Sequence, residues 1–109
     1  MIFTAPDEKI WLGVLRIEIE IPWSHSLKQK RGQLNRIKDR FRSKSNLSVA
    51  EVGYLDNHKR SVLSIVMTGN EARPIESSLD KYSKMLHSLI DGNVISLHKK
   101  LFPYSPEFP

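Results

Sequence analysis

The sequence contains no cysteine, which excludes disulfides, thiolate catalysis and cysteine-based zinc sites. It has no apolar run approaching the ~20 residues that a membrane-spanning helix needs. Its first residues, MIFTAPDEK, lack a basic region followed by an apolar stretch, so we expect no signal peptide. These absences favour a cytoplasmic protein that makes no membrane contact.

Acidic residues are scarce in one long basic stretch, from His25 to Lys44, where Asp39 is the only acid. The stretch holds eight of the 17 lysines and arginines: Lys28, Lys30, Arg31, Arg36, Lys38, Arg40, Arg42 and Lys44. Its apolar residues recur at helical spacing, at Leu27, Leu34, Ile37 and Phe41. The pattern predicts a helix over 26–44, with Ser26 as the N-cap.

The cations of this helix are distributed around its apolar stripe. At about 100° per residue, Arg31, Lys38 and Arg42 lie along one edge of the stripe. The solvent side carries Arg36 and Arg40. Lys30 lies among the apolar positions, so we expect its stem to pack and its ammonium to reach solvent.

Cations that neighbour one another without acids repel, which favours an anionic partner over a merely solvated surface. The net charge of +5 points to nucleic acid in the same way.

The rest of the chain alternates strand-like and helix-like patterns. Strands are predicted over 10–21, 47–55, 61–68 and 93–101, with a hairpin turn at 56–60 and a second helix from Pro74 to about Gly92. The length of 109 residues predicts a single domain with a core over about 10–101 and extended tails, 1–9 and 102–109. The order βαββαβ predicts an α+β, ferredoxin-like split βαβ sandwich, with a four-stranded antiparallel sheet and both helices on one face.

The other face of this sheet is predicted to be open. Alternation places on it Arg16, Glu18, Glu20, Glu51, Val62, Ser64, Val66 and Thr68. In the second strand, Ala50, Val52 and Tyr54 are expected on the side opposite to Glu51. Charges mixed with valines suit self-association, so Arg16, Glu18, Val62 and Val66 are the candidate interface of a homodimer. The alternative is an ordinary solvated face.

Two segments carry a resemblance to a known family. The run VLRIEIEIPWSHSLKQKR from Val14 to Arg31, followed by LSVAEVG from Leu47 to Gly53, resembles the YlxP-like family, a bacterial domain of unknown function. The resemblance implies a ferredoxin-like fold. Because genes of this family often lie beside those for translation initiation and ribosome maturation factors, it also implies an RNA- or ribosome-linked role. It supplies no catalytic residues. The chain departs from the family at His58, where members usually have tryptophan.

Catalytic and metal-binding patterns are weak. The four histidines show no metal-ligand spacing, and we expect no metal and no cofactor. Ser24, His25 and Ser26 are adjacent, but adjacency does not supply the third group that orients a catalytic base. An acylphosphatase-like loop would need glycine and arginine after the first strand, and 22–26 has neither. We therefore expect a protein that is not an enzyme.

The sequence favours an RNA- or ribosome-associated accessory factor that binds phosphates through the basic helix. The predicted nucleic-acid contacts are Lys28, Lys30, Arg31, Arg36, Lys38, Arg40 and Arg42. An anion site is predicted at the helix start, at His25 and Ser26, although capping alone also explains Ser26. The alternative function is an oligomeric protein–protein interaction module that uses the open sheet face and has an acidic protein partner.

Overall fold

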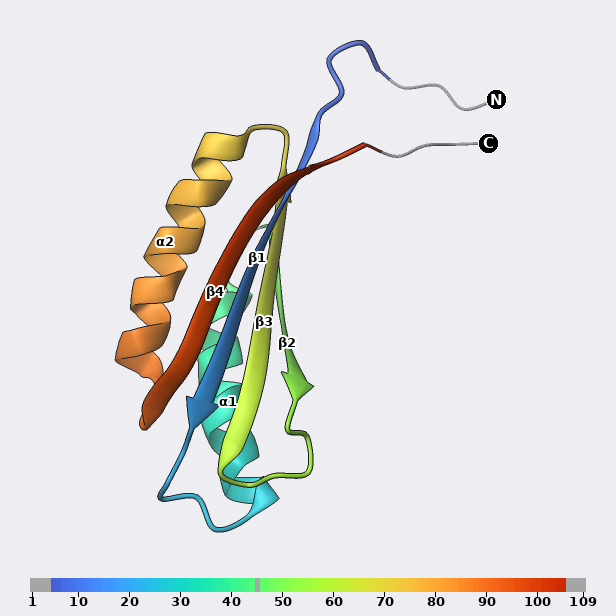
Figure 1. The fold of residues 1–109 in the computed structure, drawn as a ribbon. Coiled ribbons are helices and arrows are strands. Elements are labelled where there is room, and N and C mark those ends of the chain that lie inside the picture. The colour runs from blue at the N-terminus through green and yellow to red at the C-terminus, as the bar shows by residue number, and fades with distance from the viewer. Residues whose placement is uncertain (1–4, 45, 106–109) are drawn as a thin grey trace.

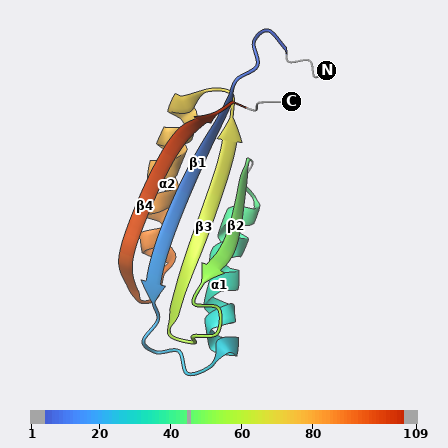
Figure 2. The ribbon, with the colours of Figure 1, turned by 45° about the vertical axis from the view of Figure 1, so that its right-hand side comes forward.

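The structure is a computed structural model that describes residues 5–44 and 46–105. In this part of the chain, four strands and two helices follow one another as β1 (Ile10–Glu20), α1 (Leu27–Arg42), β2 (Leu47–Gly53), β3 (Arg60–Gly69), α2 (Ala72–Leu89) and β4 (Asn93–Tyr104). The strands form one antiparallel sheet in the order β2-β3-β1-β4, and both helices cover the same face of it (Figures 1 and 2). The predicted α+β, ferredoxin-like fold is confirmed.

Strand β1 is one of the two central strands, and its alternation of apolar and charged residues gives it one buried and one open face. Leu15, Ile17 and Ile19 are fully buried beneath the helices. Their neighbours Arg16 and Glu18 point to the open face, as a two-residue period requires. The strand pairs with β3 on one side and with β4 on the other.

The two helices cover the apolar face of the sheet and complete the core. α1 buries Leu34, Ile37 and Phe41, and α2 buries an apolar stripe that includes Leu79 and Tyr82. The rings of Phe41 and Tyr82 pack edge to face, with their centroids 5.4 Å apart. Burial of each such side chain contributes roughly 1.5–3 kcal/mol to folding. α1 packs over β2, whereas α2 packs over β1 and β4, so a groove separates the two helices.

Several boundaries differ from the predicted ones: β2 ends at Gly53 rather than at residue 55, and α2 ends at Leu89 rather than near Gly92. α2 begins at Ala72, two residues before the predicted Pro74. β4 continues to Tyr104, so 102–104 are strand rather than the predicted extended tail. The extension forms because these residues pair with the long N-terminal half of β1, down to Ile10. Of the predicted tails, 1–4 and 106–109 lie outside the described residues.

The predicted faces of β2 are reversed. Leu47, Val49 and Glu51 point toward the helices, while Ala50 and Val52 lie on the open face. A strand has only two sides, so a reversed assignment changes every residue at once. Leu47 and Val49 offer more apolar surface to the core than Ala50 does. Glu51 is tolerated inside because a lysine of α1 neutralises it.

Candidate nucleic-acid interface

The basic residues of α1 lie on both flanks of the helix. On the flank over β2, Lys38 and Arg42 border a small hollow whose floor is Phe41, Leu47 and Val49. On the flank toward α2, Arg36 and Arg40 border the groove between the helices. The two rows predicted from the helical wheel therefore face different surroundings.

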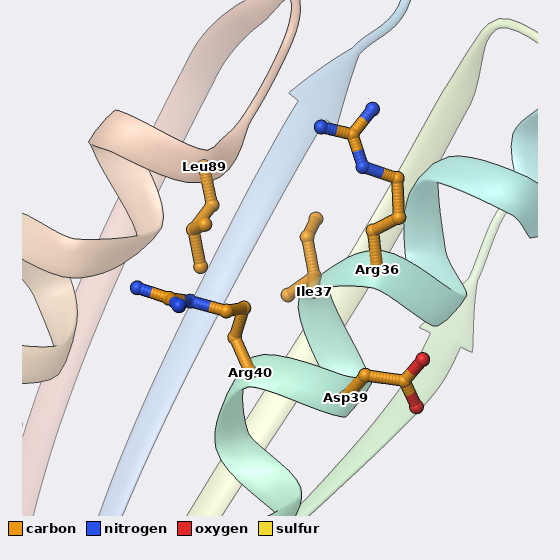
Figure 3. Close-up of a pocket in the computed structure, with 5 residues that line it drawn as sticks. All are labelled: Arg36, Ile37, Asp39, Arg40 and Leu89. Carbon is orange, nitrogen blue, oxygen red and sulfur yellow. The ribbon is translucent and has the colours of Figure 1, made fainter.

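The groove toward α2 has a volume of about 420 Å³. Ile37 of α1 and Leu89 of α2 both line it, but Ile37 is fully buried, so the partly exposed Leu89 supplies its apolar surface. In Figure 3, Arg40 extends toward the segment that carries Leu89, and Arg36 stands on the other side of Ile37. The groove thus presents one partly exposed leucine beside two cationic side chains.

The exposed cations of α1 are nearly free of acidic partners. Arg42 Nη1 lies 3.0 Å from Asp39 Oδ1, but both side chains are largely exposed, so this pair contributes little to stability. Among the described residues, no carboxylate lies within ion-pair distance of four other exposed cations of the helix, Lys28, Arg31, Arg36 and Arg40, or of the half-buried Lys38. These charges remain available to a polyanion.

Lys30 differs from the other cations of the helix. Its side chain is 1% exposed, and its Nζ lies 2.9 Å from Glu51 Oε2. The same ammonium donates to the backbone carbonyl of Tyr54 at 2.8 Å, and to those of Leu55 and Arg60 at 3.3 Å each. The prediction that the Lys30 ammonium reaches solvent is wrong, because Lys30 lies on the sheet side of α1 and the hairpin covers it. Lys30 is therefore not a surface contact for RNA.

The segment before α1 is fixed by hydrogen bonds within the chain. Ser26 Oγ accepts from the amide of Gln29, and Gln29 Oε1 accepts from the amide of His25. Lys59 Nζ donates to the carbonyls of Pro22 and Ser24, at 2.6 and 2.9 Å. The capping explanation of Ser26 therefore holds. An anion at His25 and Ser26 stays a prediction.

On the open face, the candidate interface residues largely bind one another. Glu18 pairs with both Arg16 and Arg60, and Arg16 also donates to Ser96. The hydrogen bond from Arg60 lowers the pKa of Glu18, partial burial opposes the change, and Arg16 lowers the pKa further. The same pair raises the pKa of Arg60. These charges are satisfied within the chain without a partner molecule.

The two valines of the predicted interface have different exposures. Val66 is 38% exposed, but Val62 is 5% exposed, so its predicted exposure is wrong. The irregularity in β2 brings Gly53 opposite Val62, and a Cβ at Gly53 would lie 3.0 Å from the Val62 Cβ. The backbone of β2 thus covers Val62, and only Val66 of this pair presents apolar surface.

Sequence reasoning missed two contributors to these sites. Leu89 packs against the core but is only partly buried, and its exposure in the groove depends on how far apart the helices lie. Lys59 was treated as turn material, yet it binds the loop before α1. No local sequence signal distinguishes either residue.

Across the described ranges, 5–44 and 46–105, no cluster of three metal-ligating side chains and no helix apolar enough to cross a membrane is present.

Residues 12–99 match the family described as "Protein of unknown function (DUF503)". The chain belongs to this family. A relative in Bacillus subtilis (strain 168), "Uncharacterized protein YlxP", is 31% identical over 77 residues, which are 71% of this chain and 84% of the relative. The resemblance seen in the sequence is therefore confirmed, and neither description assigns a function.

Two solved structures are weakly similar to this member of the DUF503 family. "De novo designed protein Foldit4" has a TM-score of 0.48 at 12% identity, over 92% of this chain and 100% of that chain. The second is "LarC2, the C-terminal domain of a cyclometallase involved in the synthesis of the NPN cofactor of lactate racemase, apo form". It has a TM-score of 0.48 at 13% identity, over 85% of this chain and 56% of that chain. Likeness at this level assigns no function.

The segment that carries the family resemblance serves mainly the fold in this member of the DUF503 family. Ser26 caps α1 and Lys30 binds the hairpin, while Glu51 of the second segment is the partner of Lys30. Lys28 and Arg31 are exposed and have no such structural partner among the described residues. The surface charge of α1, and not this internal network, is the part of the motif open to a ligand.

Proposed function

We propose that this protein is a non-enzymatic, RNA- or ribosome-associated accessory factor that binds the phosphate backbone through α1. The observation that supports the proposal is the set of exposed cations on both flanks of this helix, with Asp39 as its only acid. The helix has 16 residues, a length of roughly 24 Å, so it spans several phosphates of a nucleic-acid strand. Arginine suits this role because its planar fork donates two hydrogen bonds to one phosphate.

The sheet is a poor alternative surface for RNA. Ferredoxin-like RNA readers stack bases on aromatic residues of the two central strands. Here those strands, β1 and β3, present charged, small or β-branched side chains to the open face, such as Arg16, Glu18, Ser64 and Val66. Trp11, the aromatic residue of β1, packs against the core. Contacts made by α1 would therefore go to phosphates and carry little sequence information.

The first experiment distinguishes RNA from protein partners. The tagged protein is used to capture partners from a bacterial lysate, with and without nuclease treatment. RNA binding predicts that RNA is recovered and that nuclease releases the associated proteins. Protein partners that stay bound after nuclease, with no RNA recovered, would favour the alternative of an acidic protein partner.

The second experiment locates the surface by charge reversal. Arg31, Lys38 and Arg42 are changed together to glutamate, and Arg73, Lys81 and Lys84 of α2 serve as the matched control set. Each set changes the net charge from +5 by three times −2, to −1. Fluorescence anisotropy with a single-stranded RNA should show loss of binding in the α1 variant and a much smaller loss in the α2 variant. Equal losses would mean that net charge, and not α1, determines binding.

Salt dependence provides an independent measure of phosphate contacts. The logarithm of the affinity should fall with the logarithm of the salt concentration, by about 0.7 per neutralised phosphate on a single strand. Titrations between about 50 and 200 mM salt should therefore give a steep slope for the wild type, and a shallower slope when α1 cations are removed. An affinity that does not change with salt would exclude the proposed phosphate contacts.

A further inference from the structure

The groove between α1 and α2 has the composition of a ligand site. Its volume of about 420 Å³ falls within the roughly 300–1,000 Å³ of small-molecule pockets. The partly exposed Leu89 offers an apolar surface, Ile37 lines the groove as a fully buried side chain, and Arg36 and Arg40 stand on either side of Ile37 (Figure 3). An apolar surface beside two guanidinium groups matches a ligand with one flat apolar part and one anionic part.

The groove carries an excess of positive charge, which favours an anionic ligand. In the part of the chain that the structure describes, neither Arg36 nor Arg40 has a carboxylate within ion-pair distance. Asp39 also lines the groove, but it pairs with Arg42, and Figure 3 shows it pointing to the side opposite Arg40. Arg36 and Arg40 are four residues apart on one helix, where like charges repel. A bound phosphate would relieve that repulsion.

Nucleotides have the required combination of parts. An unstacked base is flat and apolar on its faces, and it stacks on guanidinium planes as well as on aromatic rings. Its phosphate accepts paired hydrogen bonds from arginine. An acidic protein segment would also satisfy the arginines, but its carboxylates offer no flat apolar face to Leu89.

We propose that the groove holds one unpaired nucleotide of a single-stranded RNA, with its base against Leu89 and its phosphate on Arg36 and Arg40. The inference rests on the proposed RNA binding and adds a specific subsite to it. The remaining cations of α1 then hold the neighbouring phosphates, while the groove makes affinity depend on the presence of a base.

The test compares two fluorescent probes, an oligoadenylate of about 12 nucleotides and an abasic ribose-phosphate chain of the same length. Both carry the same backbone charge, so counterion release is matched. For the wild type, the oligoadenylate should bind roughly 5- to 150-fold more tightly, which is the range for stacking of one base. Methyl signals of Leu89 should shift with the oligoadenylate through the ring current of the adenine, and not with the abasic chain.

Substitutions at adjacent residues of α2 provide the matched control. Leu89→Lys adds a charge inside the groove, and Ser88→Lys adds the same charge at an exposed neighbouring position that does not line it. Both variants should bind the abasic chain at least as tightly as the wild type. The preference for bases should fall toward onefold in Leu89→Lys and persist in Ser88→Lys. Circular dichroism and thermal melting check that both variants fold.

The arginines are tested in the same assay. Arg36→Ala with Arg40→Ala should weaken binding and abolish the preference for bases. Arg31→Ala with Arg42→Ala, on the other flank, should weaken binding and keep the preference.

Equal affinity of the wild type for the two probes would overturn the nucleotide subsite and leave RNA binding by α1 standing. A preference that survives in Leu89→Lys or in the Arg36 and Arg40 variant would also overturn it. Absence of binding to both probes would refute the subsite and the proposed function together.

Discussion

Replacement of the buried Lys30 should destabilise the protein strongly. Lys30→Met keeps an unbranched side chain that is one atom shorter, and it removes the ammonium that contacts Glu51 and three backbone carbonyls, those of Tyr54, Leu55 and Arg60. Removing one partner of a buried ion pair costs about 3–5 kcal/mol, because the other charge stays buried without compensation. Glu51 keeps a hydrogen bond from Ser61 and its side chain is 18% exposed, so we expect the lower end, about 3 kcal/mol.

The assay is urea unfolding followed by circular dichroism, together with thermal melting. A loss of about 3 kcal/mol is a large fraction of the total stability of a small domain, which is roughly 5–15 kcal/mol. The melting temperature should fall by roughly 12–20 °C. Lys28→Met is the matched control, because Lys28 is exposed on the same helix. Its effect should stay within about 0.5 kcal/mol.

A second substitution tests the physical reason. If the cost comes from the uncompensated carboxylate, neutralising Glu51 in the Lys30→Met background should restore stability. The free energy of unfolding of the variant with both Lys30→Met and Glu51→Gln should exceed that of Lys30→Met by at least about 1 kcal/mol. A loss below about 1 kcal/mol in Lys30→Met would refute the reasoning. A double variant less stable than the single one would refute it too.

Three further predictions concern stability measured by urea unfolding. Because Arg60 lowers the pKa of Glu18 in the folded state, that carboxylate adds stability at neutral pH which is lost as the pH falls through the lowered pKa. The stability difference between the wild type and Glu18→Gln should therefore shrink from neutral pH to about pH 3, and a constant difference would contradict the cause given. Gly32→Ala should stabilise the protein by up to about 1 kcal/mol, because a Cβ there meets no atom within 4 Å and alanine favours the helix; a loss of stability would exclude this. Gly92→Ala should destabilise the protein by about 1–3 kcal/mol, because the new Cβ would collide with the carbonyl oxygen of Glu20. An unchanged urea midpoint would contradict this and show that the turn can move.

Most of the fold follows from local patterns that the sequence displays directly. The alternation from Leu15 to Ile21 and the helical spacing of Leu34, Ile37 and Phe41 specify which elements form and which sides they bury. The reversed faces of β2 show where such patterns fail. Ala50 and Val52 are apolar but small, so the strand's own sequence barely distinguishes its two sides.

The candidate site likewise combines features that the sequence displays with features that depend on the fold. The density of cations on α1 and the scarcity of acids are properties of the sequence, and the exposed positions of Arg36 and Arg40 agree with the helical wheel. The role of Lys30 does not follow from the wheel. A lysine on the apolar side of a helix can extend past the core or remain inside it, and the choice depends on whether a carboxylate and carbonyls lie within reach.

The sequence by itself determined the order of the elements, the apolar stripes and the charge of α1, because each depends on residues close together in the chain. The tertiary structure decided which of those charges remain at the surface. Glu51 and the hairpin carbonyls, 21 to 30 residues away along the chain, bring Lys30 inside. Leu89, on the other helix, completes the groove beside Arg36 and Arg40. Such contacts join residues distant in sequence, and their geometry is set only when the helices pack on the sheet.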